Sequence, residues 1–358
     1  MGSMQGLAHP KCYVTNGVYG CYTLAPLFQH PHTEESLMSQ RCLLLAMLVL
    51  LCQLTPAFAA EPPKTEKQRI TAASGVKMRA TPRPDGQEVT RLFIGTELRE
   101  LERSERQETV GSKKDYWYRV ATPEGQEGWV FGAFVLPFEP ERRVQTVLEI
   151  AGQRLADQKA PFVDRADLAN FLKGAAEKAP DKASAARLEL ARWRAVRWAL
   201  GALATEEVPK KAYEPWVKRQ GEGLVYNELG AEWLVDSKGL WKLEEKYRGL
   251  PEAEAFAWEA ATTPLLGECE GYTPCYLAAA NATEGEYLRR YPSGPQAGKA
   301  LAMLEETLGT DGFELDQDGR AELRKELDKL EATLGKVEPA KKKKVMEKLQ
   351  ALRKAAGR

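Results

Sequence analysis

The sequence predicts a multi-domain β + α protein in which a small β-barrel precedes an all-α helical domain. Its 358 residues are more than one ordinary core needs and enough for two. From Arg69 to Pro137, short runs of alternating apolar and polar residues are separated by glycine and proline, which is typical of strands and turns. After Pro137 the apolar residues recur at helical spacing. This change of period predicts a domain boundary near Pro137.

An apolar run near the start of the chain has the features of an export signal. Cys42–Cys52 follows Arg41 and ends shortly before Ala57-Phe58-Ala59, a small-x-small cleavage pattern. The run is too short to span a bilayer, which takes about 20 residues, and a buried core helix is the alternative interpretation. We expect cleavage near Ala59. The expected segments are an unstructured or artefactual extension (1–37), a signal peptide (38–59) and a linker (60–68).

The composition excludes several kinds of catalytic and binding site. All three histidines, His9, His30 and His32, precede the expected cleavage site. A mature chain without histidine cannot form a Cys-His or Ser-His pair or a zinc site with histidine ligands. Basic and acidic residues number 51 each, so the overall charge does not indicate nucleic acid. We therefore expect no cofactor, no metal and no nucleic-acid partner.

The strand pattern covers residues 69–137, where we expect about five strands in a small closed barrel. Val76–Arg79 and Glu97–Leu101 alternate apolar and polar residues, and Tyr116–Val120 is aromatic and β-branched. The expected turns lie at Pro82, Pro84-Asp85-Gly86, Gly95 and Glu124-Gly125.

A set of residues recurs in a recognisable order along this predicted barrel. The set is Val76-Lys77-Met78-Arg79-Ala80 with Pro82, Val89, Gly95-Thr96, Trp117-Tyr118-Arg119-Val120, Gly125, Gly128-Trp129-Val130 and Phe134-Val135. In this order the segment resembles the bacterial SH3-like (SH3b) family, and the Gly-Trp-Val ending is its most specific part. The sequence departs from the family in the charged insert Glu102–Lys114, which lengthens one hairpin loop and bears on the shape of the ligand groove.

The resemblance implies a binding module of the kind attached to bacterial cell-wall proteins, with a peptidoglycan peptide or an envelope protein as its ligand. The candidate ligand-binding residues are Tyr116, Trp117, Tyr118 and Trp129, because aromatic rings offer a rigid apolar surface with a polar edge. Side chains alternate along a strand, so we expect only one face of Tyr116–Tyr118 to point inward. Packing of Trp129 in the barrel is the alternative to ligand contact.

The helical domain is expected over residues 138–313. Apolar residues repeat at helical spacing in three successive sets: Val144, Val147, Leu148, Ala151 and Leu155; Leu168, Phe171, Leu172 and Ala175; Leu188, Ala191, Ala195, Ala199 and Leu203. Thr205–Gly230 contains Pro209 and Pro215, and we expect it to be a long connection. Most of the domain's tryptophans are expected in its core, and one at the surface would mark a partner site.

One segment of this domain has the form of a joint between two helices. In Glu284–Leu301, Tyr291-Pro292 would end one helix, and Ser293, Gly294 and Pro295 would begin the next. The segment resembles the joints of tetratricopeptide-like envelope proteins. No strict repeat period recurs, so we expect tetratricopeptide-like helix pairs and not a regular array.

Two cysteines, Cys269 and Cys275, remain after the expected cleavage. In an oxidising compartment their spacing favours a structural disulfide, worth about 2 kcal/mol in the loop-entropy model. A redox motif would have two intervening residues, and a metal site would need further soft ligands.

The last segment, 314–358, is charged and is expected to form two helices separated at Gly335 and Pro339. The basic stretch 341–358 is a solvated helix face or, alternatively, a contact with an anionic envelope surface. Asp316–Gly319 resembles a calcium loop but lacks its later acidic ligands, which favours a helix N-cap.

These observations predict an exported envelope binding or scaffold protein, periplasmic or secreted, in a bacterium. A structural subunit of a larger envelope assembly would have the same chemistry. The alternative is a cell-wall hydrolase of the carboxylate glycosidase type, which needs two acids and no histidine. Glu232 beside Trp233 and Glu259 beside Trp258 are then the candidate acids. We expect binding and not catalysis, because neither glutamate has a distinctive catalytic context.

Overall fold

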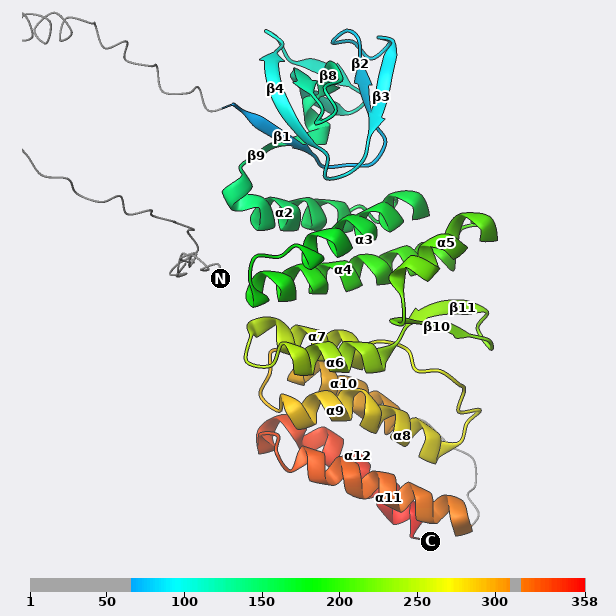
Figure 1. The fold of residues 1–358 in the computed structure, drawn as a ribbon. Helices are drawn as coiled ribbons and strands as arrows, with labels where there is room; N and C mark the ends of the chain where they lie inside the picture. The colour runs from blue at the N-terminus through cyan, green and yellow to red at the C-terminus, as the bar shows by residue number, and fades with distance from the viewer. Residues whose placement is uncertain (1–65, 310–316, 358) are drawn as a thin grey trace, which may run out of the picture. The chain divides into compact units, whose positions relative to one another are not determined.

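The computed structural model describes residues 66–309 and 317–357 of the chain (Figure 1). The expected extension (1–37) and signal peptide (38–59) lie outside the described residues, as do all three histidines. Within the described residues, no helix is both long enough and apolar enough to cross a membrane.

Residues 68–138 form a curved antiparallel sheet, here called the barrel. Its seven strands lie in the order β3-β2-β8-β7-β4-β1-β9. Their bounds are β1 (Gln68–Thr71), β2 (Val76–Arg79), β3 (Glu88–Leu92), β4 (Glu97–Arg103), β7 (Trp117–Ala121), β8 (Glu127–Phe131) and β9 (Val135–Phe138). Alternation along β2, β7 and β8 buries Met78, Val120 and Val130 completely in the barrel core. The expected strands at 76–79, 97–101 and 116–120 are confirmed to within two residues at each end.

The number of strands is larger than the expected five or so, and two segments without a strong alternation contribute to the excess. The first is β1, which pairs with both β4 and β9. The second is the charged insert Glu102–Lys114, which forms a separate hairpin of β5 (Glu108–Val110) and β6 (Lys113–Asp115). The insert is thus an ordered part of the barrel's surface.

One end of the barrel packs against the first helices. Ile70 and Phe138 belong to the same hydrophobic cluster as the helical core. Gly95 has a φ of +82°, and a Cβ atom there would lie 2.1 Å from a ring carbon of Phe171. A glycine is therefore required at this position for both its backbone conformation and its close approach. An ion pair between Arg143 and Glu97, at 2.6 Å, joins the same two parts.

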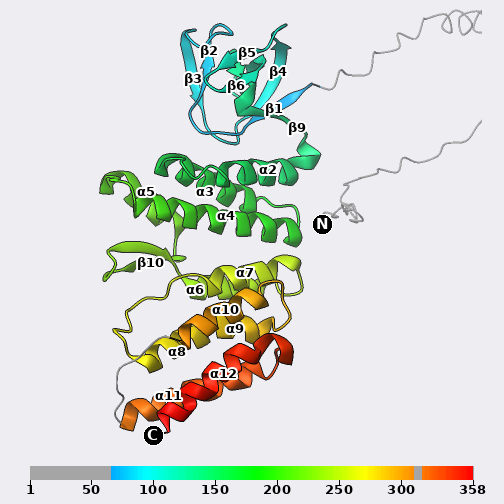
Figure 2. The same ribbon diagram turned by 180° about the vertical axis from the view of Figure 1, so that it is seen from behind.

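The rest of the described chain is mainly helical (Figure 2). The bounds are α2 (Arg143–Leu155), α3 (Phe162–Glu177), α4 (Lys182–Leu203), α5 (Lys210–Gln220), α6 (Ser237–Lys246), α7 (Pro251–Ala261), α8 (Thr273–Ala282), α9 (Glu284–Arg290), α10 (Ala297–Thr307), α11 (Gln317–Leu334) and α12 (Pro339–Ala356). Neighbours in sequence pack as pairs, most extensively α3 with α4 and α6 with α7. The expected break between two C-terminal helices, at Gly335 and Pro339, is confirmed.

The expected long connection at Thr205–Gly230 is wrong. This stretch contains α5 and the strand β10 (Leu224–Asn227), which pairs with β11 (Glu232–Val235). Pro215 lies inside α5, yet the helix forms because the adjacent Trp216 is buried and its indole N–H donates to the carbonyl oxygen of Ala166 at 3.2 Å. Tertiary packing here outweighs the helix-breaking signal of proline.

The helices enclose two hydrophobic clusters that meet at α6 and α7. The first cluster includes Phe256 and the second Ala257, which are neighbours on α7, while Trp241 packs against both. A buried carboxylate also links the clusters: Glu244 of α6 accepts a hydrogen bond from the Tyr291 hydroxyl at 2.8 Å and pairs with Arg290 of α9. The two halves of the helical region are therefore held together by both apolar packing and a buried ion pair.

The segment expected to join two helices lies between α9 and α10. Tyr291 is the C-cap of α9, as the pattern predicts. The next helix begins at Ala297 with Gln296 as its N-cap, so Pro295 lies before the helix and not in its first turn. The Tyr287 hydroxyl accepts a hydrogen bond from the Gln296 N–H at 3.2 Å, which fixes this turn.

Candidate ligand-binding groove of the barrel

A pocket of about 330 Å³ lies on the barrel, here called the groove. Three parts of the chain form it: strands β2, β7 and β8 of the barrel, the insert hairpin, and the helices α2 and α3. Its lining residues are Ala73, Ser74, Gly75, Val76, Lys77, Arg79, Pro84, Val110, Trp117, Phe131, Phe134, Arg154 and Asp164. The barrel and the helices belong to one compact unit, Thr65–Arg358.

The floor of the groove is aromatic. Trp117 and Phe131 are cross-strand partners on β7 and β8, and their ring centroids are 5.3 Å apart. Phe134 meets Phe131 edge to face, with a centroid distance of 6.0 Å. Such pairs prefer tilted and edge-to-face geometry, so the three rings form one continuous apolar surface.

Only one face of Tyr116–Tyr118 points into the barrel core, as expected, but the opposite face is buried as well. Both Trp117 and Tyr118 are buried, on opposite faces of β7. Tyr118 faces the barrel core, whereas Trp117 faces the insert, and its indole N–H donates to a carboxylate oxygen of Glu108 at 2.9 Å. The insert therefore covers the outer face of the strand, which in a plain barrel would meet solvent.

The four predicted aromatic residues do not form one site. Trp117 lines the groove, but Tyr116, Tyr118 and Trp129 are not among its lining residues. The guanidinium of Arg69 lies 3.6 Å from the centre of the Tyr118 ring, and that of Arg103 lies 4.4 Å from that of Tyr116. Trp129 is half-buried on β8, opposite Arg119. Of these three residues, only Tyr118 is buried, whereas Tyr116 and Trp129 are half-buried.

Two polar features complete the groove. The Ser74 hydroxyl is buried and has no hydrogen-bond partner among the described residues. Lys77, Arg79 and Arg154 bring three cations, of which the Arg79 guanidinium donates to the carbonyl oxygen of Gly86 at 2.6 Å. Buried polar groups are normally hydrogen-bonded, so Ser74 is suited to meet a ligand.

The one carboxylate in the lining comes from the helices. Asp164 of α3 pairs with Arg154 of α2 at 3.1 Å. Burial raises the pKa of Asp164 above its ordinary value, and the attraction of Arg154 only partly opposes this. The lining as a whole carries more positive than negative charge, so the groove suits an apolar or aromatic group beside a carboxylate.

The comparisons with known proteins agree with this geometry. Residues 74–135 match the model of the bacterial SH3 domain family. The barrel is a bacterial SH3 domain. Comparison with curated proteins and with solved structures found no match for the chain. The family match covers the groove residues from Ser74 to Phe134 but not Ala73, nor Arg154 and Asp164, which the helices add.

Sequence reasoning missed most of the groove. Phe131 carried a usable signal, because it lies two residues after Trp129 and so shares its face of β8. Phe134 and Lys77 belong to the family pattern but were not selected as binding residues. Arg154 and Asp164 carried no signal, since their place in the groove depends on how the helices pack.

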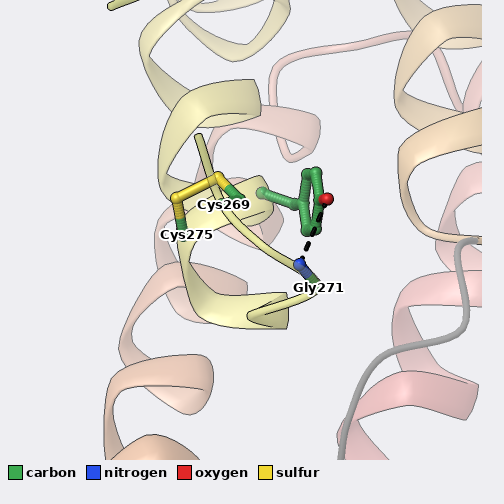
Figure 3. Close-up of a disulfide and its surroundings, with 4 residues drawn as sticks. Cys269, Gly271 and Cys275 are labelled. Carbon is green, nitrogen blue, oxygen red and sulfur yellow. Dashed lines mark hydrogen bonds between the residues drawn. A yellow bond between two sulfur atoms is a disulfide. The ribbon is translucent and has the colours of Figure 1, made fainter. Parts of the chain in front are cut away.

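The predicted disulfide between Cys269 and Cys275 is present, with a Cα–Cα distance of 5.4 Å (Figure 3). It closes the loop that leads into α8. Within the loop, Gly271 has a φ of +83°, and its N–H donates to the Tyr276 hydroxyl at 3.4 Å. The disulfide thus anchors the start of α8.

One candidate acid and two lysines of the basic C-terminus have structural partners. Glu259 pairs with Arg194 at 2.8 Å and with Arg197 at 2.6 Å, whereas Glu232 lies on the separate strand β11. In α12, Lys342 and Lys348 donate to main-chain carbonyl oxygens of α11 and α10.

The expected N-cap at Asp316 lies outside the described residues. Among those that are described, no group of three or more His, Cys, Asp and Glu side chains could hold a metal ion.

Proposed function

We propose that this is a bacterial envelope binding or scaffold protein, exported to the periplasm or secreted. Its SH3 groove binds a cell-wall peptide or envelope protein that carries a carboxylate, and its helical region docks a partner. In this proposal the barrel domain covers 69–137, the helical domain 138–313 and the charged C-terminal helices 314–358. The protein binds and does not catalyse.

The groove itself carries this proposal. Trp117, Phe131 and Phe134 offer an apolar floor, Ser74 offers an unpaired hydroxyl, and Lys77, which pairs with Glu88 at 3.5 Å, offers a partly exposed cation. Peptidoglycan stem peptides are short, apolar in part and rich in carboxylates, and therefore match each of these groups. Binding energy at such sites concentrates on buried aromatic residues and charge-assisted hydrogen bonds.

Two other features support export and a scaffold role. The disulfide between Cys269 and Cys275 suits an oxidising compartment. Helix pairs that stack side by side, as α3 with α4 and α6 with α7, suit a tetratricopeptide-like docking region. On the hairpin β10–β11, Tyr226 and Leu229 are exposed, which suits contact with a partner protein.

The test is co-sedimentation of the purified protein with peptidoglycan sacculi over a series of salt concentrations. Pelleting that persists at high salt is expected, because much of the binding surface is apolar. Lys77→Glu reverses a charge in the groove and is expected to weaken binding by roughly tenfold or more. Lys114→Glu is the matched control, since it makes the same change in the insert outside the groove lining.

If the Lys77→Glu and Lys114→Glu variants pellet equally, binding to the cell wall does not depend on the groove. If the unaltered protein stays in the supernatant at every salt concentration, the cell-wall ligand is wrong. Capture of envelope proteins on the immobilised protein, compared with the Lys77→Glu variant, then tests whether the groove binds a protein.

A further inference from the structure

A second and larger pocket, of about 530 Å³, lies in the helical region, far in sequence from the barrel. Its walls come from α8, α9, the C-terminal half of α11 and the turn that follows α11, and it is here called the helical pocket. Its lining residues are Ala278, Asn281, Ala282, Glu286, Arg289, Glu326, Lys329, Ala332, Thr333 and Lys336. The alanines keep the space open, and the remaining lining residues are polar or charged.

A buried amide in this pocket has an unused acceptor. The Asn281 side chain is 6% exposed, and its amide nitrogen donates to the main-chain oxygen of Glu326 at 2.9 Å and to its carboxylate at 3.0 Å. These two acceptors fix the orientation of the amide, because a flipped amide would place oxygen against oxygen. The Asn281 Oδ1 atom then has no donor among the described residues.

A buried acceptor without a donor is costly and therefore needs an explanation. Glu326 lines the same pocket; its carboxylate accepts from the Asn281 amide nitrogen, and the residue is 5% exposed and pairs with Lys329 at 2.6 Å. An amide oxygen and a carboxylate in one pocket are acceptors for an ammonium group or another multiple donor.

The helical pocket is also lined by cations. Arg289 pairs with Glu286, but Lys336 has no ion-pair partner among the described residues. Lining cations therefore outnumber lining carboxylates. A ligand with a carboxylate would pair with Lys336 without displacing an existing partner.

We propose that the helical pocket binds a small zwitterion, an amino acid or a dipeptide. The ammonium group donates to Asn281 Oδ1 and Glu326, and the carboxylate pairs with Lys336. The volume lies within the usual range for small-molecule sites, roughly 300–1,000 Å³. This site is independent of the groove and of the function proposed for it.

The proposal is tested by calorimetric titration of the purified protein with dialanine and with free alanine as probes. Two dialanine derivatives serve as controls: N-acetyl-dialanine lacks the ammonium group, and dialanine amide lacks the carboxylate. Dialanine or alanine is expected to bind, and each derivative to bind roughly tenfold more weakly or not at all.

Variants place the binding in the pocket. Ala332→Leu fills the space from α11 and is expected to abolish binding, whereas Ala321→Leu, an exposed position of the same helix outside the lining, is expected to leave binding unchanged. Lys336→Ala is expected to weaken dialanine roughly tenfold but not dialanine amide. Lys325→Ala, at an exposed position of α11 outside the lining, is its control.

Three results would overturn the proposal. The first is no heat from either probe at millimolar concentration, which would leave Asn281 Oδ1 to water alone. The second is equal binding of dialanine and its two derivatives. The third is binding that survives Ala332→Leu in a variant whose thermal unfolding shows that it is folded.

Discussion

The groove of the SH3 domain and the helical pocket are lined by different kinds of side chain. In the groove, the floor residues Trp117 and Phe131 are 2% and 3% exposed, so they stabilise the barrel as well as line the site. In the helical pocket the corresponding walls are alanines, and polar side chains supply the chemistry. Substitutions in the groove should therefore change stability and binding together, whereas in the helical pocket the two effects should separate.

The largest effect is expected for Trp117→Ala. Removing this buried ring leaves a cavity and frees Glu108 from the indole, and large-to-small substitutions of this kind cost about 3–5 kcal/mol. Urea unfolding should show this loss, and sacculus binding should disappear with it. Trp129→Ala is the matched control, because this half-buried tryptophan lies outside the groove lining. A Trp117→Ala variant with unchanged stability would contradict the conclusion that the floor residues stabilise the barrel as well as line the groove.

Gly95→Ala tests whether ligand binding in the groove depends on the packing of the barrel against α3. A Cβ atom at this position would overlap the Phe171 ring, and the left-handed backbone disfavours any side chain. Together these effects are expected to cost about 2–4 kcal/mol in the free energy of unfolding. Groove binding should weaken as well, because the helices supply Arg154, one of the cations of the groove lining, while zwitterion binding to the helical pocket should persist.

Combining Gly95→Ala with Phe171→Ala provides the control for this substitution. The second change removes the ring that the new methyl group meets, so the double variant should lose less stability than the sum of the single variants. Additive losses would show that backbone strain alone accounts for the effect.

Glu326→Gln should have a smaller effect on stability and a clear one on binding. The amide oxygen of glutamine can still accept from Asn281, so the free energy of unfolding should change by about 1 kcal/mol or less. Dialanine binding should weaken roughly tenfold, since the ammonium group loses a charged acceptor. A large loss of stability would mean that substitutions in the helical pocket, like those in the groove, change stability and binding together.

The sequence predicted local structure better than it predicted either site. Strand and helix periods located β2, β4, β7 and most helices, and the family pattern identified the SH3 domain. Pro215 suggested a connection where Trp216 in fact anchors a helix, because burial of a ring outweighs a local breaking signal.

Prediction of the groove from the sequence was limited in the same way. Trp117 was selected as an aromatic residue, but its burial depends on Glu108 of the insert, and Asp164 reaches the groove from α3. Residues far apart in sequence come into contact there, and the periodicity of a sequence contains no information about such tertiary contacts. Gly95 was predicted as a turn residue, whereas its close approach to Phe171 followed only from the packing.

The smallest effect is expected for Asp164→Asn, and it depends on pH. Burial raises the pKa of Asp164 in the folded protein above its ordinary 3.8, so the folded state holds the proton more tightly than the unfolded state. Ionisation of the carboxyl group therefore lowers the free energy of unfolding. This loss develops as pH rises from the pKa of Asp164 in the unfolded state through its higher pKa in the folded state, and it is complete at neutral pH.

Asparagine removes this cost but also the partner of Arg154, so the net gain at neutral pH should stay below about 1 kcal/mol for a partly exposed pair. Urea midpoints measured from about pH 3 to about pH 7 should show the variant gaining on the unaltered protein as pH rises. In the groove, the same substitution removes the only lining carboxylate and should strengthen sacculus binding at neutral pH. Weaker binding of the variant would instead mean that Asp164 contacts a cationic group of the ligand.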